Sequence, residues 1–301
     1  MKVGHVPIEG AAAPVAKKKI DWAKIADFVK TKEFMAGAGA FVAILFAFWP
    51  LLSLLPANWM NFDSHYGHGL LIPPAAAYII YARWSKMKDI PVKGSTWALM
   101  LLLPTLYLAI VASRTVMPLV LSVAFITTLF AAVWYVAGFK CALALSPAIG
   151  FLILGLPVLD RVVDSWTFKL QLVSTDVAEG LLKLTGHNVL RSQATLLSMD
   201  NFDLNIAGAC SGLKTTIAVS ASVVFFMLVT PLRWWANVVL AVVAVPLSVF
   251  INGLRITMIG MVGNANGTEA GMQFHDYSGF IALVVCFFIL AKLTKFLEVK
   301  S

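Results

Sequence analysis

The sequence predicts an all-α polytopic membrane protein with about eight transmembrane helices. Hydrophobic residues make up 60% of the 301 residues and charged residues only 13%, and the mean hydropathy is +0.85. Soluble domains of this size do not have that balance. Apolar runs near the ~20 residues that a bilayer requires recur along the chain, covering roughly 36–55, 69–84, 96–113, 116–138, 141–159, 212–230, 234–254 and 279–296.

The chain begins with a polar and basic segment, residues 1–34, that contains the run Lys17-Lys18-Lys19. From Ile20 to Phe34 the pattern predicts a short amphipathic helix lying on the membrane surface. The charged region is too long for a cleavable signal peptide, and no small-residue cleavage site follows a short apolar core.

The distribution of lysine and arginine predicts the orientation in the membrane. With the N-terminus in the cytoplasm, most of the 23 basic residues fall on the cytoplasmic side. An even number of spans then returns the tail, residues 298–301, to the cytoplasm, as expected for a multi-pass protein of the cell membrane. The net charge of +8 faces anionic lipid in this topology. We therefore expect membrane lipids as partners, and no nucleic acid.

The first five runs lie within residues 35–159. Pro73 and Pro74 near the start of the second run predict a helix that is kinked or starts late. Ser113-Arg114-Thr115 separates the third and fourth runs and predicts a tight turn.

Residues 160–209 form the largest segment on the outer side. Its first half spaces apolar residues by threes and fours, which predicts an amphipathic helix at the outer interface, ended by Gly186. Its second half predicts a β-hairpin: Val189–Leu197 is one arm, Ser198–Asn201 the turn and Phe202–Ile206 the other arm. This hairpin leads directly into residues 210–297, which carry the last three runs.

Cys210 lies between two glycines at the start of the sixth run, in Gly208-Ala209-Cys210-Ser211-Gly212. At the first turn of a helix, unpaired N–H groups and the positive end of the helix dipole favour a thiolate, which is the nucleophilic form. A cysteine in a hydrophobic protein is otherwise usually a small core residue. We interpret Cys141 and Cys286 in that second way.

Arg255 and His275 are predicted at the same depth as Cys210: Arg255 at the outer end of the seventh run and His275 just before the eighth. An arginine there can simply snorkel to the interface, and a lone histidine is most often structural. Together, however, a thiol, an imidazole and a guanidinium are the groups that a thiol acyl-transfer enzyme needs. Asp276 is not expected to be the partner of His275, because adjacent side chains diverge.

Four motifs, spread over roughly residues 45–296, together resemble the exosortase/archaeosortase family of multipass membrane cysteine enzymes. They are His68-Gly69-Leu70-Leu71-Ile72-Pro73-Pro74, Ala209-Cys210-Ser211-Gly212, Asn252-Gly253-Leu254-Arg255-Ile256 and Phe274-His275. The resemblance implies that Cys210, Arg255 and His275 are catalytic. It places His68, Ser211, Gly212 and Asn252 near the site.

The resemblance also implies a function: a cysteine transpeptidase or protease whose active site faces the extracytoplasmic side. Its substrates would be exported proteins with a PEP-CTERM-like C-terminal tail, made of a short motif, one transmembrane helix and a basic end. Cleavage would pass through a thioester, and the acceptor nucleophile is not specified. Small residues of the fifth run, Ala148, Gly150 and Gly155, could pack against the substrate helix. No cofactor or metal is expected, since His65 and His68 have no third ligand at a suitable spacing.

Three alternatives stay open. A polytopic transporter would usually place ionisable residues near mid-membrane, whereas the predicted span centres are nearly free of charge. An enzyme of lipid-linked glycans would usually show acidic residues for Mg²⁺ or several arginines for phosphate, and no such grouping lies near the motifs. A structural scaffold would leave the Cys210, Arg255 and His275 pattern accidental.

Overall fold

The computed structural model describes residues 32–61, 64–115, 117–158, 160–206 and 212–300. The chain divides into two compact units, residues 1–42 and 43–301. The described part of the first unit is the beginning of helix α2 (Lys32–Ala47). The predicted surface helix of Ile20–Phe34 falls mostly outside the described residues, so it stays a prediction.

The first predicted span, 36–55, corresponds to a bent pair of helices. The chain bends by 68° between Ala38–Ala47 and Trp49–Met60, where α2 gives way to α3 (Trp49–Leu52) and α4 (Leu55–Met60). Pro50 and Pro56 lie in the first turns of α3 and α4. Proline cannot donate a backbone hydrogen bond inside a helix, so each one restarts the helix instead of continuing it.

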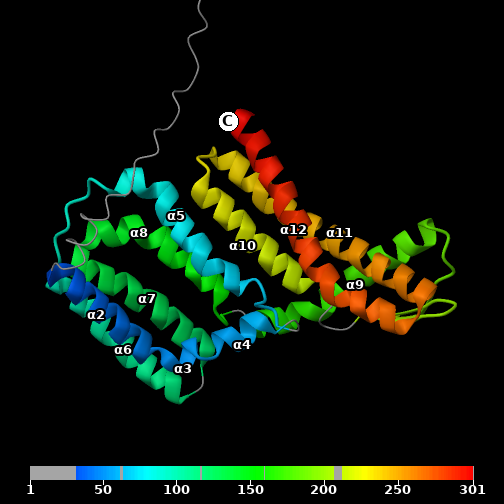
Figure 1. Ribbon diagram of the computed structural model, residues 1–301, viewed down its shortest axis with the longest axis horizontal. Helices are drawn as coiled ribbons and strands as arrows, with labels where there is room; N and C mark the ends of the chain where they lie inside the picture. The colour runs from blue at the N-terminus through cyan, green and yellow to red at the C-terminus, as the bar shows by residue number, and fades with distance from the viewer. Residues whose placement is uncertain (1–31, 62–63, 116, 159, 207–211, 301) are drawn as a thin grey trace, which may run out of the picture. The chain divides into compact units, whose positions relative to one another are not determined.

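The next elements form a group of helices that pack side by side (Figure 1). They are η1 (Gly69–Leu71), α5 (Ile72–Met87), η2 (Thr96–Ala98), α6 (Leu99–Arg114), α7 (Pro118–Ala137), α8 (Phe139–Phe151) and η3 (Leu152–Gly155). Pro73 and Pro74 fall in the first turn of α5, a position that tolerates proline. The predicted late start of this helix is therefore confirmed. Phe48 and Phe125 pack edge to face at 5.2 Å in the core of this group.

The second half contains α9 (Asp160–Leu184), three short strands, α10 (Leu213–Val229), α11 (Trp234–Asn266) and α12 (Thr268–Lys300). In Figure 1, α10, α11 and α12 lie together, and α9 runs along α11. The amphipathic helix predicted in the outer segment is confirmed as α9. Gly186 follows it with φ of 82°, a left-handed conformation that favours glycine.

The predicted hairpin is a three-stranded antiparallel sheet. Its strands are β1 (Leu190–Gln193), β2 (Leu196–Ser198) and β3 (Asp203–Asn205), in that order. The single arm predicted for Val189–Leu197 is wrong, because the chain reverses within it. Leu197 therefore lies between Arg191 and Leu204. Leu197 and Leu204 point into a core that the sheet shares with α9 and α11.

Helices α11 and α12 extend well past the predicted spans 234–254 and 279–296. The α11 extension is covered by protein, since α9 and the sheet pack against it. The segment that contains Phe202 packs closely on α11 at Gly263, where a Cβ would lie 2.6 Å from the Phe202 ring. Hydropathy finds the lipid-facing part of a helix but does not find a continuation that another segment covers.

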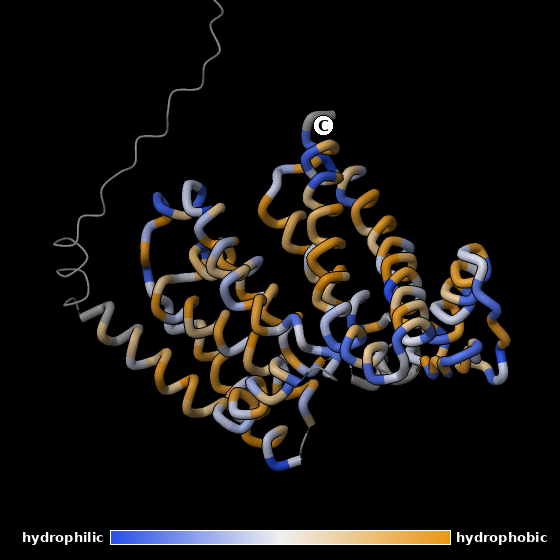
Figure 2. Tube along the Cα trace, turned by 45° about the vertical axis from the view of Figure 1, so that its right-hand side comes forward, coloured by the Kyte–Doolittle hydropathy of each residue, from blue (hydrophilic) through white to orange (hydrophobic). Residues whose placement is uncertain are grey.

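Four described helices are long and apolar enough to cross a membrane: Thr96–Arg114, Pro118–Ala137, Trp234–Asn266 and Thr268–Glu298. The bent pair around Phe48 would be a fifth span, and Phe139–Gly155 and Leu213–Val229 are shorter apolar helices. Hydrophobic residues run along these helices, while hydrophilic residues gather at helix ends and loops (Figure 2). This is the pattern of a multi-pass membrane protein. The predicted count of about eight spans is not confirmed.

Candidate functional site

Arg255 lies inside α11 and is only 9% exposed. Its Nε donates to the Ser278 Oγ at 3.0 Å, and its Nη2 donates to the backbone carbonyl of His275 at 3.1 Å. Both acceptors belong to α12. The expectation that Arg255 ends a helical span is wrong, and so is the snorkelling alternative. A buried guanidinium requires such hydrogen bonds because its charge has been removed from water.

His275 lies within α12, two turns after the helix begins at Thr268. It was expected just before the last span, whereas the helix that forms this span already includes it. The Ser278 Oγ also donates to the His275 carbonyl, at 3.0 Å. Two hydrogen bonds therefore fix the backbone of His275, one from its own helix and one from Arg255.

Asp276 contacts the His275 side chain, so the expectation that it is not the partner of His275 is wrong. Its Oδ1 lies 3.2 Å from Nδ1 of His275, although adjacent side chains of a helix start in different directions. The His275 side chain is 17% exposed and the Asp276 side chain 65% exposed, so the carboxylate reaches back from the surface. A bond at Nδ1 restrains the orientation of the imidazole ring.

Asn252 and Gly212 come together across α11 and the start of α10. Asn252 is fully buried, and its Nδ2 donates to the Ser174 Oγ of α9 at 3.1 Å. Gly212 has φ of 78°. It lies so close to Asn252 that a Cβ on Gly212 would be 2.7 Å from Nδ2 of Asn252. The space beside Gly212 is therefore filled by the Asn252 amide.

Two more contacts hold α9 and α10 against α11. A Cβ on Gly253 would overlap Cγ1 of Val177, so only glycine allows α9 this close to α11. Thr216 of α10 and Ser248 of α11 share a hydrogen bond of 2.9 Å between their hydroxyl oxygens. The helices that carry the motifs are therefore packed tightly at the site.

Cys210 and Ser211 lie outside the described residues. The segment that contains them is bounded by Ile206, 1% exposed, and Leu213, 6% exposed. The nucleophile and its neighbour stay predictions, while the positions of Gly212, Asn252, Arg255 and His275 are established within the described chain.

His68 has a structural role in the early motif. It is 6% exposed, and its Nε2 lies 3.1 Å from the Leu154 carbonyl. Trp59 donates from Nε1 to the next carbonyl, that of Gly155, at 2.8 Å. These are carbonyls at the end of a helix, which lack partners within the helix itself. A Cβ on Gly69 would overlap the Trp59 indole, so the His-Gly pair of this motif is required by the same packing.

The environment of His68 lowers the pKa of its imidazole below the ordinary value of 6.5, because burial disfavours the charged ring. The hydrogen bond to Leu154 opposes this shift without overcoming it. The ring is therefore neutral at physiological pH. Since a carbonyl only accepts, Nε2 carries the proton.

Sequence reasoning missed Ser174, Ser278 and the pairing of Asp276 with His275. Ser278 lies three residues after His275, on the same face of a helix. That signal was hidden because the predicted span began only at residue 279. Ser174 lies on the buried side of α9, and nothing in the sequence relates it to Asn252.

One of three comparisons with known proteins identifies a family. A family model described as transmembrane exosortase matches residues 59–292, a range that includes the four motifs and the contacts of Arg255 with α12. No curated protein and no solved structure matches the chain. Because the family model covers most of the sequence, the chain belongs to the transmembrane exosortase family.

Proposed function

We propose that the protein is a membrane cysteine transpeptidase or protease that cleaves the C-terminal sorting tail of exported proteins at the outer face of the membrane. The observation that best supports this is the buried guanidinium of Arg255, hydrogen-bonded to the backbone of His275 within the region that matches the family. Two of the three predicted catalytic residues are thus joined directly.

In the proposed reaction, the Cys210 thiolate attacks the carbonyl carbon of the scissile peptide bond. The resulting tetrahedral intermediate collapses to a thioester as the C–N bond breaks, and protonated His275 gives its proton to the leaving amine. An acceptor amine or water then attacks the thioester while His275 removes its proton. This second collapse releases the product and restores the thiolate and the imidazolium.

Arg255 has two roles in this proposal. Its bonds to Ser278 and His275 hold the α12 backbone that carries the imidazole. The guanidinium would also stabilise the tetrahedral oxyanion, which is commonly the largest electrostatic contribution to acyl transfer. Asp276 would orient the ring through Nδ1.

The proposed topology has eight spans, with both termini in the cytoplasm and the site outside. The test of function is cleavage of a tailed exported protein when it is produced together with this chain. The wild type should release the tail, and Cys210→Ala should leave the substrate full length at an equal level of enzyme. Cleavage by Cys210→Ala would contradict the proposal.

A further inference from the structure

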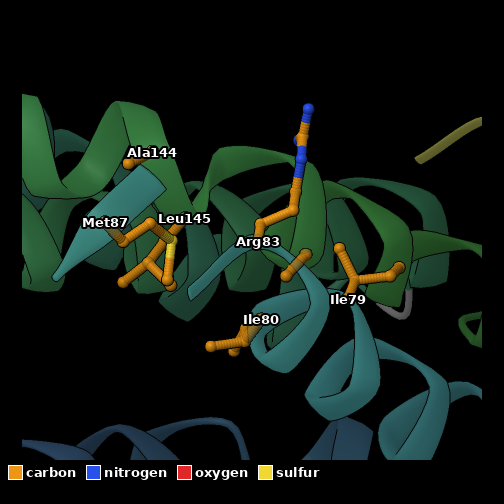
Figure 3. Close-up of a pocket in the computed structure, with 7 residues that line it drawn as sticks. Ile79, Ile80, Arg83, Met87, Ala144 and Leu145 are labelled. Atoms are coloured by element: carbon orange, nitrogen blue, oxygen red, sulfur yellow. The ribbon is translucent and has the colours of Figure 1, made fainter. Parts of the chain in front are cut away.

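Two hollows in the described chain lie away from the start of α10. A cavity of about 450 Å³ between α5, α10 and α12 reaches α10 only from Ala218, more than one turn after that helix begins. A second hollow, between α5 and α8, encloses no space for a ligand, and Arg83 points away from it (Figure 3). Ala148 and Gly155, expected to pack against a substrate helix, instead pack within the chain: Ala148 is buried, and Gly155 contacts Ile72. The first turn of α10 is therefore shaped by contacts with neighbouring helices.

Gly212, the residue before α10, is held by two sets of contacts. Its carbonyl accepts hydrogen bonds from the backbone N–H of Thr216 at 2.8 Å and from the Thr216 Oγ1 at 3.0 Å. The Thr216 hydroxyl also pairs with Ser248 of α11 at 2.9 Å. The Asn252 amide fills the place where a Cβ of Gly212 would lie. Because the backbone here has a left-handed φ of 78°, the direction in which the chain enters α10 depends on these contacts.

Ser174 of α9 restrains the orientation of that amide. Its Oγ accepts a 3.1 Å hydrogen bond from Nδ2 of Asn252, the atom that would lie 2.7 Å from a Cβ on Gly212. Ser174 is 1% exposed and Asn252 is 0% exposed, so the loss of this acceptor is costly. Val177, one turn later on α9, packs on Gly253 and holds α9 against the same turn of α11.

The neighbouring hydroxyl on α9 has a different use. Thr175 is also fully buried, but its Oγ1 donates to the Gln171 carbonyl of the same helix at 2.8 Å. This is an ordinary way for a buried hydroxyl to be satisfied within a helix. Ser174 reaches across to the amide that confines Gly212. Of these two adjacent hydroxyls, Ser174 is the one joined to the start of α10.

We propose that Ser174 is a positioning residue for the predicted nucleophile, Cys210, and acts through Asn252 and Gly212. This inference rests on the proposed function. Two residues of chain separate Cys210 from Gly212, so their Cα atoms are at most about 7.6 Å apart. A thiol next to the start of a helix is made more acidic by the unpaired N–H groups and the dipole of that helix. That effect falls off within one turn, so a displacement of Gly212 weakens it.

The test is the pH profile of Cys210 alkylation by iodoacetamide, measured on the full chain in detergent without substrate. Cys141→Ala and Cys286→Ala make Cys210 the single thiol, since the chain has three cysteines. The matched variants are Ser174→Ala and Thr175→Val, which each remove one buried hydroxyl from the same turn of α9. Apparent melting temperatures report whether each variant is folded.

Ser174→Ala should slow alkylation at pH 7 about fivefold, on the scale of one lost hydrogen bond. Above about pH 10 its rate should equal that of the wild type, because the thiol is then ionised in both. Thr175→Val should keep the wild-type profile. If Ser174→Ala does not fold, Ser174→Thr and Ser174→Val give the same comparison, because they differ by one hydroxyl.

Turnover of a tailed substrate gives a second measurement. Ser174→Ala should lower kcat by about tenfold at an unchanged KM, because the displaced group acts in the reaction and not in substrate binding. Ser174→Thr, which retains the hydroxyl, should recover both the turnover and the alkylation profile.

An alkylation profile that Ser174→Ala leaves unchanged, or equal changes in Ser174→Ala and Thr175→Val, would overturn the inference. The profile requires no substrate, so this outcome would leave the proposed chemistry of Cys210 untouched. A wild type that is alkylated but does not cleave a tailed substrate would contradict the proposed function and would not alter the comparison of the two variants.

Discussion

The Nη2 atom of Arg255 donates a 3.1 Å hydrogen bond to the backbone carbonyl of His275, so that a buried cation of α11 holds the part of α12 that carries the predicted general acid. The same guanidinium donates to Ser278, whose hydroxyl donates to the same carbonyl. Guanidinium, hydroxyl and carbonyl thus form a closed triangle between the two helices. The first prediction follows from this arrangement.

Arg255→Lys should reduce turnover by ~10²-fold or more, on the scale of a lost oxyanion donor. Lysine keeps the charge but cannot contact Ser278 and the His275 carbonyl in the same fork geometry.

Ser278→Ala removes one acceptor and keeps the cation, so turnover should fall by about tenfold or less. Single-turnover cleavage of a tailed substrate measures both. Arg233→Lys, at an exposed arginine, is the control, and equal losses in Arg255→Lys and Ser278→Ala would assign Arg255 a positioning role only.

Gly212→Ala should destabilise the protein more than Gly186→Ala. Both glycines have a left-handed φ, 78° and 82°, which costs another residue about 1–2 kcal/mol. At Gly186 nothing lies within 4 Å of a new Cβ, whereas at Gly212 the Asn252 amide lies at 2.7 Å. Apparent melting temperatures in detergent compare the two variants.

The overlap can be tested separately by a double-mutant cycle. Asn252→Ala removes the obstructing amide, so the Gly212→Ala, Asn252→Ala double variant should be more stable than the sum of the single changes by about 1 kcal/mol or more. Additive effects would show that Asn252 does not confine Gly212.

The contacts of His68 predict a dependence of stability on pH. Because burial lowers the pKa of the folded ring below the unfolded value of 6.5, the unfolded chain takes up the proton first. The contribution of His68 to stability is therefore complete above about pH 6.5 and is lost as the pH falls from there towards the folded pKa. His68→Gln keeps an N–H for the Leu154 carbonyl but cannot titrate. Between pH 7 and 5, the apparent melting temperature should fall more for the wild type than for His68→Gln, and identical slopes would contradict the assignment.

Cysteine labelling should report the orientation. With the N-terminus in the cytoplasm, a membrane-impermeant maleimide on intact cells should label Cys210 and spare Cys141, since the two are predicted on opposite sides of the membrane. Cys286 is fully buried and should stay unlabelled in either orientation. Labelling of Cys141 without Cys210 would invert the topology.

The sequence correctly predicted features that depend on residues close together in the chain. Pro73 and Pro74 marked the start of α5, Gly186 marked the end of α9, and the apolar run to Val229 matched α10. The motif residues Arg255 and His275 were correctly expected to lie near one another. Each of these depends on backbone chemistry or on hydropathy within a few residues.

Features with a tertiary cause could not be predicted. Helix α11 continues through Arg255 to Asn266 because α9 and Phe202 cover it, and no window of hydropathy contains that information. The bonds of Arg255 to Ser278 and of Asn252 to Ser174 join residues 23 and 78 positions apart. Pro50 is a cause of the bend after Ala47 that the sequence shows. The bend was not predicted because the apolar run 36–55 has the length of one whole span.

The most direct test of the central claim is to trap the covalent intermediate. Purified wild-type protein is mixed with a tailed substrate, quenched in acid within a single turnover, and analysed by intact mass spectrometry, with hydroxylamine treatment as a check for a thioester. We predict an adduct of the substrate's N-terminal fragment on Cys210 that hydroxylamine removes, present in Cys286→Ala and absent in Cys210→Ser. Cleavage at an undiminished rate by Cys210→Ser, with no adduct at any time, would contradict the account.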